Sequence, residues 1–145
     1  MLAPERGVDA LLGAHTNFAL IDSKAAAAAQ KLAFLCCHGP DANYKDNRFL
    51  FGMHTRSSEY TLDFIRQMLK LATKPRSVFV ATKGPGITFT QETCAAALAE
   101  LKPAADKGLL NVTAHSYSGN ATEVVEDLLD RAVAAAADVL IVCSL

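Results

Sequence analysis

The strongest constraint on the fold is a regular alternation along the chain between short apolar segments and longer segments with helical periodicity. The short segments have the length and composition of buried strands and cover residues 8–13, 32–37, 49–53, 77–81, 109–115 and 138–144. The segments between them repeat their apolar residues at helical spacing over residues 17–31, 58–73, 88–106 and 120–133. Residues 41–48 form a polar loop in this reading. Strands that alternate with helices predict βαβ units, and therefore the α/β class with a parallel sheet buried on both faces.

The segment 58–73 has a strong helical pattern. Its apolar residues form one stripe and a second row beside it: Leu62, Ile65, Leu69 and Ala72, and then Tyr60, Phe64, Met68 and Leu71. So broad an apolar surface predicts that this helix is buried on more than one side.

Composition excludes several classes of protein. The 145 residues contain 14 Lys+Arg and 15 Asp+Glu, so the net charge is -1 at pH 7 and no broad basic surface for nucleic acid is expected. No apolar run approaches the roughly 20 residues that span a bilayer, and the first residues lack the pattern of a signal peptide. Because the chain begins almost directly on one predicted strand and stops on another, we expect it to be a segment of a longer protein.

The cysteines and histidines show no metal-ligand spacing. The cysteines are Cys36, Cys37, Cys94 and Cys143, and the histidines are His15, His38, His54 and His115. Each cysteine replaces an aliphatic residue in an apolar segment, which favours buried thiols; a disulfide to chain outside this segment is the alternative. No metal and no cofactor are predicted.

The loops that follow the predicted strands are the candidate binding positions, because ligands of open α/β sheets bind at the carboxyl ends of the strands. The first loop brings Thr16 and Asn17 to the start of a helix. Their backbone N–H groups and the helix dipole favour an anion, although Thr16 or Asn17 could serve only as a helix cap.

The second loop runs from Cys37 to Asp41 and includes His38 and Gly39. Adjacent residues of a strand point to opposite faces, so Cys37 and His38 do not form a nucleophile and its base. We therefore expect no catalysis here.

The third loop, Lys83 to Gly86, resembles a glycine-rich phosphate turn. It lacks the G-x-G-x-x-G pattern because residue 89 is Phe, and it lacks the Gly-Lys-Ser/Thr of a P-loop. A tight strand-to-helix turn explains it equally well.

Two N-x-S/T sequons, at Asn111 and Asn120, are candidate glycosylation sites. They weakly favour a secreted protein.

Taken in order, these segments resemble the type I periplasmic-binding proteins, which include branched-chain amino-acid-binding proteins and receptor ligand-binding regions. GVDALLGAHTNFA (residues 7–19) is similar to the family's GVDALLGPxSS, and RFLFGMHTRSSEYTLDFIRQML (48–69) to its FFRTVPSDxxQAxAxxxLL. SVFVATKGPGITFTQETCAAAL (77–98) and TEVVEDLLDRAVAAAADVLIVCS (122–144) resemble its RVAVIYxDDxYG and DFSALLxxIKxAGADVVVLxG segments. The resemblance implies parts of two lobes, residues 1–56 and 57–145, that close on a ligand.

The resemblance implies roles for those residues that occupy the positions of the family's ligand-binding residues. Thr16 corresponds to the Ser that follows Gly-Pro in the family and, with Asn17, would hold a ligand carboxylate. The Ala-Thr pair that follows Ser-Pro-Gly in the family corresponds to Pro40 and Asp41. Asp41 thus replaces the Thr, where it would meet a ligand ammonium or exclude the usual ligand. The family's second-lobe Tyr-Gly falls on Gly86 and Ile87, so the stacking Tyr is absent.

The resemblance therefore predicts a non-catalytic, extracellular or periplasmic module that binds a polar small molecule in one cleft. The ligand-binding residues predicted for this cleft are Thr16, Asn17, His38, Gly39, Asp41, Lys83 and Gly86. A membrane anchor outside this segment and a homodimer are compatible with this reading. The alternatives are an intracellular enzyme or nucleotide-binding domain that uses Lys83 to Gly86, and an interaction scaffold that has lost its ligand.

Overall fold

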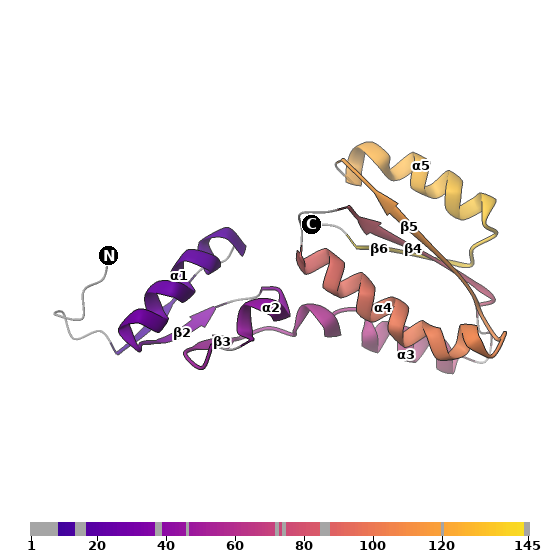
Figure 1. Ribbon diagram of the computed structural model, residues 1–145. Coiled ribbons are helices and arrows are strands. Elements are labelled where there is room, and N and C mark those ends of the chain that lie inside the picture. Colours follow the sequence, from indigo (N-terminus) through magenta and orange to yellow (C-terminus); the bar gives the residue numbers. More distant parts are fainter. Residues whose placement is uncertain are drawn as a thin grey trace. The chain divides into compact units, whose positions relative to one another are not determined.

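The computed structural model describes residues 9–13, 17–36, 39–45, 47–71, 73, 75–84, 88–119 and 121–143, with only the backbone for 17–23 and 121–123. The chain divides into two compact units, residues 1–57 and residues 58–145 (Figure 1).

The first unit contains a parallel sheet of three short strands in the order β1-β2-β3. The strands are β1 (Ala10–Leu12), β2 (Ala33–Cys36) and β3 (Leu50–Gly52), and the helices are α1 (Asn17–Gln30) and α2 (Asp41–Tyr44). The strands and α1 lie where the periodicity predicts them. The short helix α2 occupies part of the segment that was expected to be a loop.

The helices of the first unit cover one face of its sheet. Ala27 of α1 packs with Phe34, Cys36 and Leu50 in a buried cluster, and Tyr44 of α2 packs against the same cluster. Side chains on the opposite face remain open: Leu12 is 77% exposed and Phe51 is 51% exposed. The prediction of a sheet buried on both faces is therefore wrong for this unit within the described residues.

The second unit is also built on a parallel sheet, in the order β5-β4-β6. Its elements are η2 (Ser57–Glu59, which begins at the unit boundary), α3 (Leu62–Lys70), β4 (Ser77–Lys83), α4 (Thr88–Asp106), β5 (Asn111–Tyr117), α5 (Ala121–Ala134) and β6 (Val139–Cys143). Consecutive βαβ units in one parallel sheet are thereby confirmed. Strand β5 begins two residues later than the sequence predicts.

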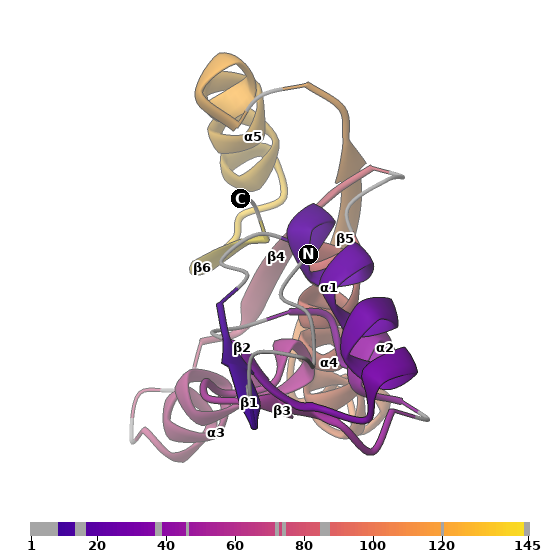
Figure 2. The same cartoon turned by 90° about the vertical axis from the view of Figure 1, so that its left-hand side faces the viewer.

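The central strand β4 is buried on both faces, as predicted. Val78 and Val80 point into a cluster with residues of α3 and α4, whereas Phe79 and Ala81 point into a cluster with Leu128 of α5. Figures 1 and 2 show α3 and α4 on one side of this sheet and α5 on the other. The alternation of side chains along a strand thus builds two cores from one sequence segment.

The predicted helix 58–73 is shorter and less buried than expected. A 3₁₀ turn precedes α3, and the helix ends where Leu71 takes an extended conformation. Ile65 and Met68 are buried, but Tyr60, Phe64 and Leu71 are largely exposed. The expectation of burial on more than one side is wrong because α4 and the sheet cover only one side of α3.

Helix α5 likewise buries only part of its apolar surface. Leu128 and Ala132 are buried against the sheet. Val125, Leu129 and Val133 form an exposed row beside them.

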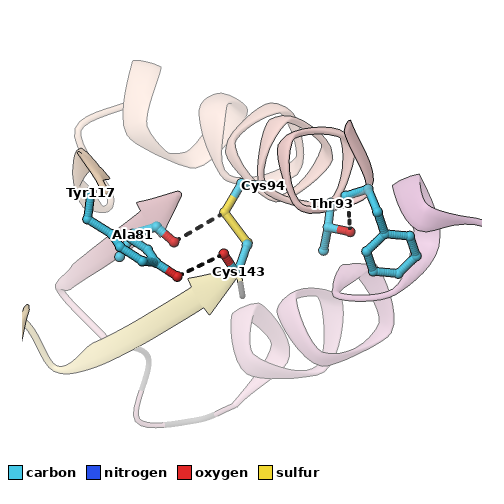
Figure 3. Close-up of a disulfide and its surroundings, with 6 residues drawn as sticks. Ala81, Thr93, Cys94, Tyr117 and Cys143 are labelled. Atoms are coloured by element: carbon cyan, nitrogen blue, oxygen red, sulfur yellow. Dashed lines mark hydrogen bonds between the residues drawn. A yellow bond between two sulfur atoms is a disulfide. The ribbon is translucent and has the colours of Figure 1, made fainter. Parts of the chain in front are cut away.

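A disulfide joins Cys94 of α4 to Cys143 at the end of β6 (Figure 3). The preference for buried thiols is wrong for this pair, because the fold brings residues 49 positions apart to a Cα–Cα distance of 5.9 Å. Cys36 is a buried free thiol, as predicted, and Cys37 lies outside the described residues.

The end of β6 has a second attachment. The hydroxyl of Tyr117 donates a hydrogen bond to the carbonyl oxygen of Cys143 at 3.3 Å. The sulfur of Cys94 also lies 3.6 Å from the carbonyl oxygen of Ala81, but a disulfide sulfur carries no proton and so makes only a contact there.

The start of β6 is held by Asp138. Its carboxylate accepts hydrogen bonds from the backbone N–H groups of Arg76 at 2.6 Å and Ser77 at 3.0 Å. The bond from Arg76, then the bond from Ser77, lowers the pKa of Asp138 below its usual value. The edge strand is therefore held at its start by the residues that begin β4 and at its end by α4 and β5.

Replacing both disulfide cysteines by serine should destabilise the protein. Loop-closure entropy for a separation of 49 residues gives a loss of roughly 4 kcal/mol. Urea unfolding without reductant should show a lower midpoint for Cys94→Ser/Cys143→Ser than for the wild type, and dithiothreitol should lower only the wild-type midpoint. Alkylation of Cys94 and Cys143 in denatured, unreduced wild-type protein would show that the disulfide is absent.

Asp138→Asn should lower stability at pH 7 more than at acidic pH. A carboxylate whose pKa is depressed by folding stabilises the native state above its unfolded pKa of about 3.9, and this contribution is lost as the pH falls through the folded-state pKa. Urea midpoints of wild type and variant should therefore converge below about pH 4. Asp130→Asn, on the exposed surface of α5, removes the same charge and serves as the control. A difference in urea midpoint between wild type and Asp138→Asn that stays constant with pH would contradict this role of Asp138.

Candidate functional site

A hollow of about 360 Å³ in the first unit lies where the chain leaves β2 and β3. Its lining residues are Gly39, Tyr44, Leu50, Phe51, Gly52, His54, Thr55 and Arg56. Gly39 follows the carboxyl end of β2, and residues 54–56 follow the carboxyl end of β3. This is the edge at which parallel α/β sheets bind their ligands.

The lining of the hollow combines an apolar wall with polar and cationic groups. Leu50, Phe51 and the ring of Tyr44 supply apolar surface, whereas His54 and Arg56 supply hydrogen-bond donors. Among the described lining residues none is a carboxylate, and Arg56 forms no ion pair with any described residue. An uncompensated guanidinium beside apolar surface suits a small ligand with an anionic group and an apolar body.

Asp41 and Ser57 fix the segments that frame this hollow. The hydroxyl of Ser57 accepts a hydrogen bond from the backbone N–H of Asp41 at 3.1 Å and donates one to Oδ1 of the same residue at 3.0 Å. Ser57 is fully buried. The pair therefore ties the first turn of α2, which follows β2, to the segment that follows β3.

This pairing gives Asp41 a structural role that the sequence does not predict. One carboxylate oxygen already accepts a hydrogen bond from the protein itself. Asp41 is absent from the lining of the hollow. That Asp41 meets a ligand ammonium stays a prediction.

The other predicted site residues are only partly described. Gly39 lines the hollow, and Asn17 is the first residue of α1, with its side chain outside the description. Thr16, His38 and Gly86 lie outside the described residues. Lys83 is the half-buried last residue of β4 in the second unit. A single cleft that brings these residues together stays a prediction.

The turn after β4 is explained in part by packing. The backbone N–H of Gly84 donates a hydrogen bond to the carbonyl oxygen of Tyr117 at 2.6 Å. A Cβ atom at this position would lie 3.0 Å from the same oxygen, so the close approach favours glycine. Because the N–H of Gly84 is occupied, it does not serve a phosphate, which weakens the nucleotide-binding alternative.

His54 and Arg56 are the site residues that the sequence analysis missed. The sequence predicts only a lobe boundary after residue 56 and gives this segment no binding role. The carboxyl-end rule applied to the other loops would have identified them, since they directly follow a predicted parallel strand.

Other candidate sites have the following outcomes. Within the described ranges, no group of three or more His, Cys, Asp or Glu residues could hold a metal ion. Asn111 is exposed at the start of β5, and its glycosylation stays a prediction; Asn120 lies outside the described residues. None of the described helices has the length and apolar character needed to cross a membrane.

Comparison with known proteins finds likeness in structure only. No protein-family model matches the sequence, and no curated protein matches it. An ABC transporter substrate-binding protein from Desulfitobacterium hafniense, solved in complex with Leu, aligns with a TM-score of 0.65 at 18% identity over 95% of this chain and 39% of its own.

Two structures from Rhodopseudomonas palustris give a similar result. An extracellular ligand-binding receptor has a TM-score of 0.63 at 14% identity, covering 96% of this chain and 37% of its own. An ABC-type branched-chain amino acid transporter has a TM-score of 0.60 at 16% identity, covering 95% of this chain and 37% of its own. The chain thus has a type I periplasmic-binding-protein-like α/β fold and spans about two-fifths of the length of these proteins.

Proposed function

We propose that this chain is part of an extracytoplasmic module that binds a small polar ligand, as a solute-binding protein or a receptor, without catalysis. In this proposal, residues 1–56 and 57–145 belong to two lobes that close on the ligand. The main observation that supports the proposal is the hollow at the carboxyl ends of β2 and β3, where Arg56 lies beside apolar surface. The structural neighbours described as substrate-binding and ligand-binding proteins support the same class of function.

The cysteine pairing supports the proposed location. Disulfides form and persist in oxidising compartments and are rare in the cytosol. The bond between Cys94 and Cys143 therefore favours a periplasmic or extracellular protein over the intracellular alternative.

The lining of the hollow supports an amino-acid-like or small organic-acid ligand. A volume of about 360 Å³ falls at the lower end of the range of small-molecule sites, roughly 300–1,000 Å³. Arg56 would bind the ligand carboxylate, and Leu50 and Phe51 would contact its apolar part. Each charge-assisted hydrogen bond of this kind contributes about 1.5–3 kcal/mol.

Arg56→Gln in the full-length protein should weaken binding of a carboxylate ligand roughly 10-fold or more, since 1.4 kcal/mol corresponds to a factor of ten. Calorimetric titration with amino acids, small organic acids and amines that lack the carboxylate would measure this. Arg56→Lys should retain part of the affinity, because it keeps the charge but not the planar guanidinium. Lys107→Gln removes an exposed charge in the second unit and should have no effect.

Two results would count against the proposal in different ways. Equal affinity of wild type and Arg56→Gln for a confirmed ligand would remove Arg56 from the site. Binding of none of these compounds by the folded full-length protein would favour the interaction scaffold.

A further inference from the structure

We infer that Tyr44 limits the length of the ligand that the hollow after β3 accepts, because its ring separates this hollow from a second cavity. The inference rests on the proposed function, since it concerns the same binding site. The second cavity is a groove of about 750 Å³ in the first unit. Its described lining residues are Lys24, Ala28, Tyr44, Lys45, Asn47, Arg48 and Phe49.

The two cavities meet at Tyr44, the half-buried last residue of α2. Among the described residues it is the one that lines both. The rest of the groove is formed by α1 and by residues 45–49, which precede β3. The rest of the hollow is formed by β3 and by residues that follow β2 and β3. A side chain shared by two neighbouring cavities forms part of the wall between them.

The ring of Tyr44 is held at its hydroxyl and along its side. The hydroxyl lies 3.0 Å from the sulfur of Cys36, and either group can donate the hydrogen bond between them. Cys36 is fully buried. The ring also packs against the buried cluster that contains Phe34 and Leu50. A side chain that is ordered in this way is a firm wall and not a mobile flap.

Gly52, the last residue of β3, leaves the space that the ring occupies. A Cβ atom at this position would lie 3.0 Å from Cε1, Cζ and Oη of Tyr44. Carbon atoms in good contact are about 3.5–4.0 Å apart, so a larger residue here would displace the ring. Gly52 and Tyr44 both line the hollow. The glycine therefore lets the ring lie against the strand that borders the proposed site.

The place of this wall relative to Arg56 would set the length limit. In the proposed function, Arg56 binds the ligand carboxylate and Leu50 and Phe51 contact the apolar part of the ligand. An apolar chain too long for the hollow then meets the ring of Tyr44, with the groove behind it. Closely packed side chains give way little, so a further methylene weakens binding instead of strengthening it.

Titration of the full-length protein with straight-chain 2-amino acids from alanine to 2-aminooctanoate, and with the matching unsubstituted carboxylates, tests this limit. Wild-type affinity should rise with chain length and then fall roughly 10-fold or more at the first chain that reaches the ring, an effect of the size that one methylene has in an apolar pocket. Tyr44→Ala should move this fall to longer chains, because the hollow then opens into the groove. Tyr44→Phe keeps the ring and should keep the limit.

Two further variants separate this role from a loss of stability. Tyr44→Leu keeps apolar contact with the buried cluster but is shorter than the ring, so it should move the limit less than Tyr44→Ala does. Phe49→Ala removes another half-buried aromatic ring that lines the groove but is not among the described lining residues of the hollow. It should leave the limit unchanged.

The reaction of Cys36 with a thiol reagent in the folded protein, mapped by mass spectrometry, tests the position of the ring without a ligand. Alkylation should be faster in Tyr44→Ala than in wild type, because the ring no longer covers the sulfur. An unchanged rate would contradict the wall at Tyr44.

The ligand series gives two further results that would overturn the inference. The same dependence on chain length in wild type and Tyr44→Ala would do so and leave the proposed binding function intact. Binding of none of the compounds by folded wild-type protein would overturn the inference and the proposed function together.

Discussion

Burial of β4 between two layers of helices is the interaction on which the second unit depends. Val78 and Val80 contribute to the core under α3 and α4, and Phe79 contributes to the core under α5. An edge strand such as β6 has a partner on one side only, and here it is fixed by Asp138 at its start and by the disulfide at its end. A rigid sheet of this kind can hold its loops, including the turn at Gly84, in a fixed geometry.

The first unit reaches a comparable result with far less buried surface. Its strands are short and only one face of its sheet is covered. Hydrogen bonds outside the sheet therefore contribute more to holding its segments in place. The double hydrogen bond between Asp41 and Ser57 joins the segments that leave β2 and β3. The hollow beside it therefore has a defined frame, and Arg56 directly precedes Ser57 in the chain. Arg56, the cation proposed to bind the ligand, thus lies after the carboxyl end of β3, where parallel sheets bind their ligands.

Most of the fold follows from the sequence, because the strands and long helices have strong periodicity. The short helix α2 does not, since four residues starting at Asp41 give no recognisable period. The exposed row on α5, including Val133, could not be predicted either, because periodicity shows which residues are apolar and not how much surface the neighbours cover. The pairing of Cys94 with Cys143 depends on long-range geometry that spacing does not encode. In the site, Gly39 was predicted to bind a ligand and lines the hollow, and its role in binding stays a prediction. His54 and Arg56 were not predicted, because the carboxyl-end rule was not applied to the strand at residues 49–53.

The central claim is that the hollow after β2 and β3 forms part of a small-molecule site. The most direct measurement is a crystal structure of the full-length protein with a bound carboxylate ligand. The expected result is a ligand oxygen within hydrogen-bond distance of the Arg56 guanidinium and the apolar part of the ligand against Phe51. A ligand bound elsewhere, with Arg56 in contact only with solvent, would contradict the claim.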